Sequence, residues 1–597
     1  MNEKALFHKR IYALLLVAVL IFSIFAIRLL DVQAVQASGF AKRASNEMWN
    51  SSVLLAPRGT ITDVNGLELA RSVAAVNIVV DQTMITDPQT TAGIAAPILG
   101  MSTSEVATLL TGKKRYQIIA KQAKPIVWRN LMSTLDSYNT GVMKERGGVA
   151  KRIVGFFSER SYIRDYPTGR LAASLVGIIN DAGVGAAGLE SSMEQSLAGQ
   201  NGRYDYANGA GTIIPGSQQF VTEAKPGKGI QLTIDRDIQW VAQNAISQAV
   251  KSAQAASGTV VVMNPKTGEI LAQASAPNFD PADRKTRTLA SLRNPAVQDV
   301  YEPGSTGKII TIASALEEGK TTPETVWTIP YSIKAGSGTF HDAEKHKTER
   351  LTTAGVLAQS SNVGAIQIGS LLSHSSLYDY LRKFGIGEST GSHLPGESAG
   401  ILPRVDTWSA TTAPTIAFGQ GYSLTALQAT SVFATIANDG VRVTPNVIAG
   451  SIDTSGGFTP SKPQKSLRVV SPETAQKMRL IMESVVSEAG TAPAAAIPGY
   501  RIAGKTGTAQ RVDDSCHCYR GYTSSFIGFA PADKPAYVVS VVIQNPRGQH
   551  FGGVIAAPVF KTVMSFVLQS KHIPPTNTVK VSFALKEADL LKKAPQP

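Results

Sequence analysis

The longest apolar stretch of the chain lies close to its beginning. It runs from Ile11 to Ile27, resumes at Leu29, and follows the basic residues Lys4, Lys9 and Arg10. As a helix this run spans about 26 Å, close to the thickness of the apolar core of a bilayer. The pattern predicts a transmembrane anchor over residues 11–30, with residues 1–10 in the cytoplasm and the remainder of the chain outside it. A cleaved signal peptide is the alternative, because Val35-Gln36-Ala37 resembles a cleavage site.

Short strand-like and helix-like stretches alternate over residues 31–225. Asn65-Gly66 stands between two alternating runs, Thr60–Thr62 and Leu67–Leu69, which is typical of a two-residue hairpin turn. Ser102, with Glu105 three residues later, predicts a capped helix start. Gly, Pro and polar residues concentrate between Asn201 and Gly229, so a domain boundary is expected there. Residues 31–225 are therefore expected to form a first, mixed domain outside the membrane.

The pattern from Ile230 onward predicts a second domain over residues 226–573. Asp235 precedes a helical apolar stripe and is the expected N-cap. Strand-like runs lie at both ends of the domain: Val260–Met263, Glu269–Ala276, Tyr500–Ala509, Tyr522–Ala530 and Tyr537–Gln544. A last helix carries Pro558 in its first turn. Together these predict one antiparallel sheet beside a helical layer, an α/β (α+β) fold, followed by a loosely attached tail over residues 574–597.

Composition narrows the function classes. With 597 residues, of which 43% are hydrophobic, the chain is long enough for more than one domain with a sizeable core. Its net charge of +14 is spread along the sequence, without a basic tract interleaved with aromatic residues. That pattern argues against a nucleic-acid partner.

The two cysteines, Cys516 and Cys518, flank His517. A disulfide across one intervening residue would be strained, so free thiols on a surface loop are expected. Three potential ligands are too few for a closed zinc site, and His341 and His346 have no supporting cluster. No metal and no cofactor is therefore expected, with a metal clip or redox role at the cysteines as the alternative.

Three short motifs in the second domain carry the chemistry: Ser305-Thr306-Gly307-Lys308, Ser360-Ser361-Asn362 and Lys505-Thr506-Gly507-Thr508. Ser305 opens a predicted helix that extends to Glu318, so Lys308 lies one turn away on the same side. A serine hydroxyl becomes a nucleophile when a neighbouring base accepts its proton. Lysine can be that base only if burial or a nearby cation lowers its pKa, and Lys505 is a candidate cation.

The other two motifs supply polar groups. Ser360 to Asn362 interrupts two helix-like stretches, so a turn there could present Ser360 and Asn362 to a cleft. Lys505 to Thr508 lies in a strand-like run with small residues, which suits a strand approached closely by another backbone. Lys505 with the hydroxyls of Thr506 and Thr508 would suit a carboxylate.

Two further matches to known motifs look accidental. Gly499 to Thr506 has the letters of a phosphate-binding loop, but no helical stripe follows it. Gly183 to Gly188 has the letters of a dinucleotide fingerprint without an adjoining apolar strand, and is expected to be a flexible turn before a helix over Leu189–Leu197.

The ordered motifs resemble those of class B penicillin-binding proteins, most closely the division-specific peptidoglycan D,D-transpeptidases of the FtsI type. The resemblance covers nearly all of the chain after the anchor. It rests on these segments: Arg58–Asp63, Glu159-Arg160, Tyr166–Gly169, Gly188–Glu190, Tyr301–Lys308, Gln359–Gly364, Phe384-Gly385, Pro395–Glu397, Phe418–Tyr422 and Lys505–Thr508. The segment from Val512 to Tyr522 departs most from the family pattern.

The resemblance implies a pedestal domain of the dimerisation type, a penicillin-binding transpeptidase domain, and cross-linking of peptidoglycan stem peptides with release of D-alanine. It implies that Ser305 is the acylated nucleophile and Lys308 its base. Ser360 and Asn362 would assist proton transfer and hold substrate. Lys505, Thr506, Gly507 and Thr508 would bind the terminal carboxylate, with the backbone N–H groups of Ser305 and Thr508 as oxyanion hole.

The resemblance also implies partners. These are peptidoglycan stem peptides, β-lactam antibiotics and membrane-embedded division proteins that include a glycosyltransferase. Three alternatives share the same fold: a transpeptidase of wall elongation, a β-lactam-binding carboxypeptidase or β-lactamase, and a non-catalytic scaffold or antibiotic sensor.

Overall fold

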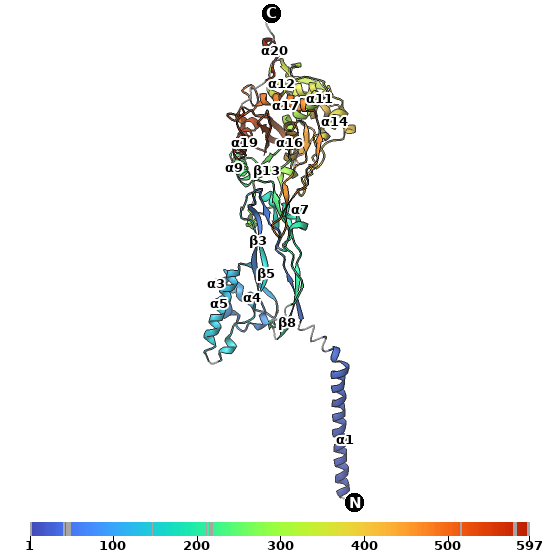
Figure 1. Ribbon diagram of the computed structural model, residues 1–597, viewed down its shortest axis with the longest axis vertical. Helices are drawn as coiled ribbons and strands as arrows, with labels where there is room; N and C mark the ends of the chain where they lie inside the picture. Colours follow the sequence, from blue (N-terminus) through green and yellow to red (C-terminus); the bar gives the residue numbers. More distant parts are fainter. Residues whose placement is uncertain are drawn as a thin grey trace. The chain divides into compact units, whose positions relative to one another are not determined.

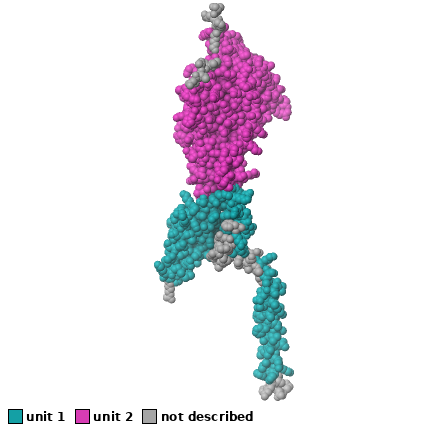
Figure 2. Space-filling view, in the orientation of Figure 1, with its two compact units in different colours: residues 1–57, 74–162, 199–226 teal, residues 58–73, 163–198, 227–597 magenta. Residues whose placement is uncertain are grey.

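The chain forms two compact units that interleave along the sequence. The computed structural model describes residues 3–39, 42, 49–145, 147–209, 212–213, 219–513, 516, 518–576 and 582–593. Unit 1 takes residues 1–57, 74–162 and 199–226, and unit 2 takes residues 58–73, 163–198 and 227–597 (Figure 2). The segments 58–73 and 163–198, expected in the first domain, thus pack with the second.

The N-terminal helix α1 (Glu3–Leu30) continues into a π-helical turn at Asp31–Val35. Residues 6–35 form one long apolar helix, the only one in the described part of the chain with the length and composition to cross a membrane. Its side chains face outward and contribute nothing to a protein core. The helix agrees with the expected anchor, and the direction in which it crosses stays a prediction.

The folded part of unit 1 is a small helical cluster beside strands. Its buried centre includes Ile78, Val106 and Leu131. Ser102 accepts a hydrogen bond from the Glu105 N–H (3.2 Å), which confirms the expected helix start. The elements of this unit are α3 (Pro88–Leu99), α4 (Thr103–Leu110), α5 (Pro125–Val142), β1 (Trp49–Leu54), β4 (Gln117–Ala123), β8 (Gly202–Gly209) and β10 (Gln219–Thr222).

The hairpin expected at Asn65-Gly66 is confirmed in unit 2. Strand β2 (Ile61–Thr62) pairs antiparallel with the start of β3 (Glu68–Val80), and Gly66 has a φ of +82°, which favours glycine. β2 also pairs in parallel with β11 (Gly229–Leu232). Segments 58–73 and 163–198 thereby share a buried apolar cluster with strands that begin the second predicted domain.

The segment around Gly183 is the turn of a short hairpin. Strands β6 (Ile178–Ile179) and β7 (Gly185–Ala187) form a hairpin, and the single expected helix is divided at Met193. Its parts are α7 (Gly188–Ser192) and α8 (Glu194–Leu197). Gly185 lies so close to the Glu190 carbonyl that a Cβ would be 2.0 Å from its oxygen, so the glycine here serves close packing.

The predicted antiparallel sheet forms the centre of unit 2. Its strand order is β13-β12-β26-β25-β24, from β13 (Ile270–Ala276), β12 (Ser257–Met263), β26 (Tyr537–Gln544), β25 (Cys518–Ala530) and β24 (Ala503–Asp513). Helices α9 (Arg236–Ser252), α19 (Ala557–Ser570) and α16 (Ala426–Ala437) pack against it (Figure 1). Because β12 and β26 are buried along nearly their whole length, both faces of the central strands are covered.

The expectation of a loosely attached tail is wrong for the described residues beyond 573. Thr576 bonds back to Gly499 (2.8 Å), and Lys586 forms a β-bridge with Leu351 of β18 (Glu349–Thr352). Ala584 is 4% exposed. The apolar run around Ala584 is too short to show a period, so only its packing partner, more than two hundred residues earlier, reveals the contact.

Candidate active site

The three motifs meet in one cleft of unit 2. It has a volume of about 620 Å³ and is lined by members of every motif, including Ser305, Ser360, Asn362, Thr506 and Thr508. Ser305 and Lys308 lie around the start of α11 (Lys308–Glu317), and the Ser-Ser-Asn motif lies at a junction between two helices. The remaining motif lies in β24, an edge strand of the central sheet. The structure therefore brings together the residues that the sequence singled out.

Ser305 lies in a 3-10 turn rather than in the first turn of an α-helix. This turn covers Gly304–Gly307, and α11 (Lys308–Glu317) begins directly after it, which corrects the expected helix start at Ser305. Ser305 Oγ and Lys308 Nζ are 3.1 Å apart. The tighter turn keeps the i, i+3 relationship that brings the hydroxyl and the amine together.

Lys308 is completely buried and surrounded by oxygen acceptors. Its Nζ donates to Asn362 Oδ1 (2.8 Å), to the Ser360 carbonyl and, more weakly, to Ser360 Oγ (3.3 Å). Burial lowers the pKa of Lys308 to about 7, although the Asp342 carboxylate partly opposes this shift. Near neutral pH a large fraction of Lys308 is therefore free amine.

Lys505, the first residue of the Lys-Thr-Gly-Thr motif, is also completely buried and lies beside the hydroxyl of Ser360. Its Nζ donates to Ser360 Oγ (2.9 Å) and to both the carbonyl and hydroxyl oxygens of Thr506 (3.2 Å each). Burial, and next the charge on Lys308, lower the pKa of Lys505 well below its ordinary value. The two lysines flank one hydroxyl, so two ammonium charges here oppose each other.

Ser360 has a φ of +64°, which is unusual for a residue with a side chain. It follows α12 (Thr353–Ala358) and lies two residues before α13 (Asn362–Gly369), whose N-cap is Ser361. The left-handed residue lets the chain reverse between the helices. As a result, the oxygens of Ser360 and Asn362 both point toward Lys308.

Asp342 holds this junction in place, and no spacing in the sequence reveals it. Its carboxylate accepts from Ser361 Oγ (2.8 Å), from the Val363 N–H (2.9 Å) and from the Asn362 N–H. It also contacts His346 Nε2 at 3.0 Å. Asp342 lies in the loop after β17 (Gly338–His341), and the carboxylate suits the N-terminus of α13.

Glycines allow β24 to pass directly beside the 3-10 turn that carries Ser305. A Cβ on Gly507 would lie 2.3 Å from Ser525 Oγ and 3.0 Å from the Pro303 carbonyl oxygen. A Cβ on Gly304, whose φ is +52°, would lie 3.0 Å from Ala509 Cβ. Strand and turn are therefore in backbone contact, which places Thr508 and Ser305 on the same cleft.

Both domains of the chain match families of known proteins. Residues 258–565 match the penicillin-binding protein transpeptidase domain, and residues 53–232 match the penicillin-binding protein dimerisation domain. The chain is 37% identical to penicillin-binding protein PbpB of Mycolicibacterium smegmatis, over 96% of this chain and 92% of that protein. The chain belongs to the class B penicillin-binding proteins. Its second domain is a serine-type transpeptidase domain.

Two other similar proteins extend the comparison. Peptidoglycan D,D-transpeptidase FtsI of Buchnera aphidicola is 30% identical over 93% of this chain and 94% of its own length. The crystal structure of penicillin-binding protein 3 from Mycobacterium tuberculosis with ampicillin has a TM-score of 0.70 and 33% identity, covering 90% of this chain and all of that one. The likeness thus spans both domains of this penicillin-binding protein.

The cysteines of this penicillin-binding protein form a disulfide, and the expectation of free thiols is wrong. Cys516 is bonded to Cys518 with a Cα–Cα distance of 5.2 Å, within the usual range for a disulfide. The pair lies at the tip of the β24–β25 hairpin, where the chain reversal brings the two Cα atoms to that distance. His517 lies outside the described residues, and the described ones include no group of three metal-ligating side chains.

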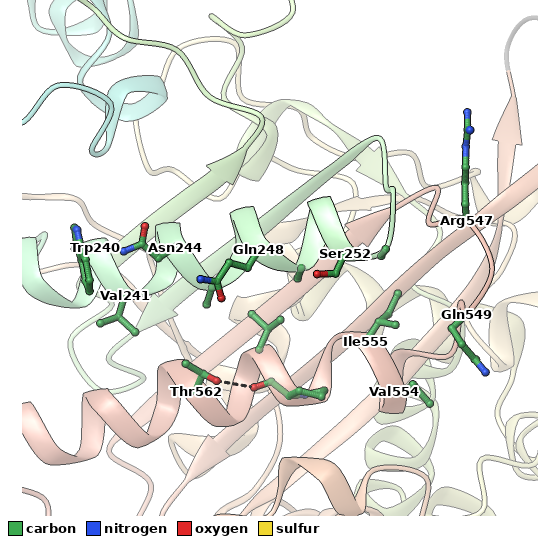
Figure 3. A pocket seen from close by; sticks show the side chains of 15 residues that line it. Trp240, Val241, Asn244, Gln248, Ser252, Arg547, Gln549, Val554, Ile555 and Thr562 are labelled. Carbon is green, nitrogen blue, oxygen red and sulfur yellow. Dashed lines mark hydrogen bonds between the residues drawn. The ribbon is translucent and has the colours of Figure 1, made fainter.

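A second hollow in the transpeptidase domain holds none of the motif residues. It is a groove of about 940 Å³ between α9, which contributes Trp240, Asn244 and Gln248, and the helical segment with Val554 and Thr562 (Figure 3). Its lining offers no nucleophile beside a buried base. Of these two hollows, only the smaller cleft is lined by the residues that the sequence singled out.

Proposed function

We propose that this penicillin-binding protein is a peptidoglycan D,D-transpeptidase that cross-links stem peptides through an acyl-enzyme on Ser305. The observation that carries the proposal is the 3.1 Å separation between Ser305 Oγ and the buried Nζ of Lys308. A pKa of about 7 lets Lys308 accept a proton at neutral pH. The match to the transpeptidase domain and the similarity to a peptidoglycan D,D-transpeptidase support peptidoglycan stem peptides as the substrate.

In the first half-reaction Lys308 removes the proton of Ser305, and the serine oxygen attacks the carbonyl carbon between the two terminal D-alanines. The backbone N–H groups of Ser305 and Thr508 would donate to the oxyanion of the tetrahedral intermediate. Collapse breaks the C–N bond, and the leaving D-alanine takes a proton relayed from Lys308 through Ser360, whose Oγ lies 3.3 Å from Nζ.

In the second half-reaction an amine of a neighbouring stem peptide attacks the ester carbonyl. The amine loses a proton through the same relay to Lys308, and a new amide bond forms. The Ser305–acyl bond breaks, and the leaving serine oxygen takes that proton from Lys308. Asn362, whose Oδ1 accepts from Lys308 at 2.8 Å, keeps the base in place and its amide side chain bounds the substrate site. The site thus returns to its starting protonation.

Lys505, Thr506, Gly507 and Thr508 form the site proposed for the terminal carboxylate. A bound carboxylate would favour the charged form of the buried Lys505, and the hydroxyls of Thr506 and Thr508 line the cleft. Gly507 supplies backbone where a side chain would collide with the turn of Ser305. A β-lactam carries a carboxylate and a strained amide, so it would acylate Ser305 by the same steps.

We assign the enzyme to septal wall synthesis, as a single-pass membrane protein with residues 1–10 in the cytoplasm and the catalytic domain outside. The support is the apolar helix at residues 6–35 and the name of the FtsI relative. Membrane-embedded division proteins, including a glycosyltransferase, are its proposed partners. Depletion in the native host separates this role from lateral-wall elongation: filaments support the first and rounded cells the second.

The mechanism is tested by intact-mass analysis of the soluble region after incubation with a penicillin. The expected result is a one-to-one adduct mapped to Ser305, absent from Ser305→Ala, and cross-linking of a stem-peptide donor and acceptor. Release of D-alanine without cross-linking would indicate a carboxypeptidase. A folded protein without any adduct would overturn the serine mechanism.

A further inference from the structure

The C-terminal segment is bonded to β18 through one isolated β-bridge and neighbouring backbone hydrogen bonds. The Thr352 N–H donates to the Leu585 carbonyl at 3.0 Å, and Leu351 forms an antiparallel bridge with Lys586. The Thr352 hydroxyl donates to the Ala584 carbonyl at 2.6 Å. The contacts are made by consecutive residues on both sides, so the segment is held in a defined register.

Ion pairs lie on either side of this backbone contact. Arg350 binds Glu587 through two hydrogen bonds of 3.0 and 2.8 Å, and Lys586 lies 3.2 Å from Glu349. All four side chains are about a third to a half exposed, so these pairs contribute little to stability. They favour one register, whereas the backbone bonds and the burial of Ala584 hold the segment.

The same segment lies directly on the first turn of α12. The Thr352 hydroxyl that donates to Ala584 also accepts from the Gly355 N–H at 2.9 Å, as the N-cap of this helix. A Cβ on Gly355 would lie 2.0 Å from the Leu585 carbonyl oxygen. A glycine inside a six-residue helix is unfavourable for the helix itself, and here it makes room for the C-terminal segment.

Helix α12 connects this contact to the reaction centre. It ends at Ala358, and Ser360 follows, with its carbonyl and hydroxyl oxygens bonded to Lys308. Glu349 and Leu351, which face the C-terminal segment, also line the catalytic cleft. A shift of β18 or α12 would therefore change the position of Ser360 relative to Lys308.

We propose that residues 583–587 are positioning residues for Ser360 and Asn362, because they clamp β18 and the first turn of α12. They touch neither substrate nor the reacting atoms. The inference rests on the proposed acyl transfer at Ser305 and assigns part of its rate to a segment more than two hundred residues away in the sequence.

The first experiment compares the soluble region with a version that ends at Thr576. Thr576 is kept because it bonds to Gly499 and Arg501. With a fluorescent penicillin, the first-order acylation constant is expected to fall about tenfold or more, since small displacements of reacting groups cost up to about a hundredfold. The constant for prior non-covalent binding should change much less than the acylation constant, because the carboxylate site proposed on β24 is not touched. Amide hydrogen exchange should rise in 352–364 and not in 503–512.

Gly355→Ala provides a second variant that keeps the chain complete. In the full chain the new Cβ should displace the C-terminal segment and lower the acylation constant as the truncation does. In the truncated chain the same substitution should cause no further loss, because its collision partner is gone. Gly141→Ala in α5, where nothing lies within 4 Å of the new Cβ, is the matched control and should leave both constants unchanged.

Equal acylation constants for the complete and truncated proteins, both folded by circular dichroism, would overturn the positioning role. Additive losses for truncation and Gly355→Ala would overturn it as well, because two independent effects add. If the complete protein gives no adduct on Ser305, the proposed function itself fails. The complete protein is tested first, so a failure of the proposed function is distinguished from a failure of the positioning role.

Discussion

Lys308 and Lys505 direct their side-chain nitrogens at a single hydroxyl group. Ser360 Oγ lies 3.3 Å from the first and 2.9 Å from the second, and both lysines are completely buried. Burial lowers the pKa of both, and a charge on either lysine opposes protonation of the other. A charge on one of the two lysines therefore favours the free-amine form of the other, which is the form that the proposed mechanism needs at Lys308.

The rate of acylation is expected to rise with pH through about 7. Lys308 accepts a proton only as the free amine, and its pKa is lowered to about 7. Below this pH the free-amine fraction falls about tenfold per unit, so the rate should fall equally, and it should level off above about pH 8. Stopped-flow acylation by a penicillin between pH 5 and 9 measures this. A flat profile over that range would show that another group is the base.

Gly507→Ala is expected to slow the acylation of Ser305 by a penicillin. The new Cβ would lie 2.3 Å from Ser525 Oγ and 3.0 Å from the Pro303 carbonyl oxygen, so β24 must move away from the turn of Ser305. A displacement of this kind costs about ten- to a hundredfold in rate. Gly93→Ala in α3, with open space around the new Cβ, is the control and should acylate normally. Equal rates for the two variants would refute the close-packing argument.

Glu190→Gln is expected to destabilise unit 2 strongly. Glu190 is fully buried and pairs with two buried guanidiniums, Arg58 and Arg164, the latter at 2.7 Å. Removing its charge leaves these cations undercompensated, which costs about 3–5 kcal/mol. Thermal unfolding of the soluble region reports the change. Glu145→Gln, which breaks an exposed pair with Lys151, should have no measurable effect, and similar midpoints for both variants would contradict the expectation.

Thiol labelling is expected to fail on the native protein. The chain has two cysteines, and these are joined as Cys516–Cys518. A maleimide should add nothing before reduction and two labels after treatment with a reductant, as seen by intact mass. Labelling of the untreated protein would contradict the disulfide and restore the free thiols expected from the sequence.

Much of the fold could be predicted because its elements carry strong local signals. Strand β26 matches the predicted Tyr537–Gln544 run at both ends, and Asp235 caps α9 as expected. The division of residues 31–225 between two units could not be predicted, since β2 carries no mark of its pairing with β11. The C-terminal contact at Leu351 was missed for the same reason: it depends on a partner, not on a periodic pattern.

The candidate site could be predicted more fully than the fold. Residues three positions apart lie about one turn apart in both an α-helix and a 3-10 helix. The contact between Ser305 and Lys308 is therefore present although the turn is 3-10 and not α-helical. Asp342 was missed because its bonds reach residues 19–21 positions later, where no spacing rule applies. Ser360 was identified by its motif, but its left-handed backbone was not.

The central sheet joins strands that lie far apart in the sequence. Gly258 of β12 lies opposite Ile543 of β26, and β24 is attached to β12 only through β25 and β26. Pairings at such sequence separation form late and slowly during folding. Until they form, Lys505 is not beside Ser360 and β24 does not line the cleft. Under the proposed acylation of Ser305, a penicillin label would count only the molecules that have completed folding, so the antibiotic would report the refolding yield of this protein.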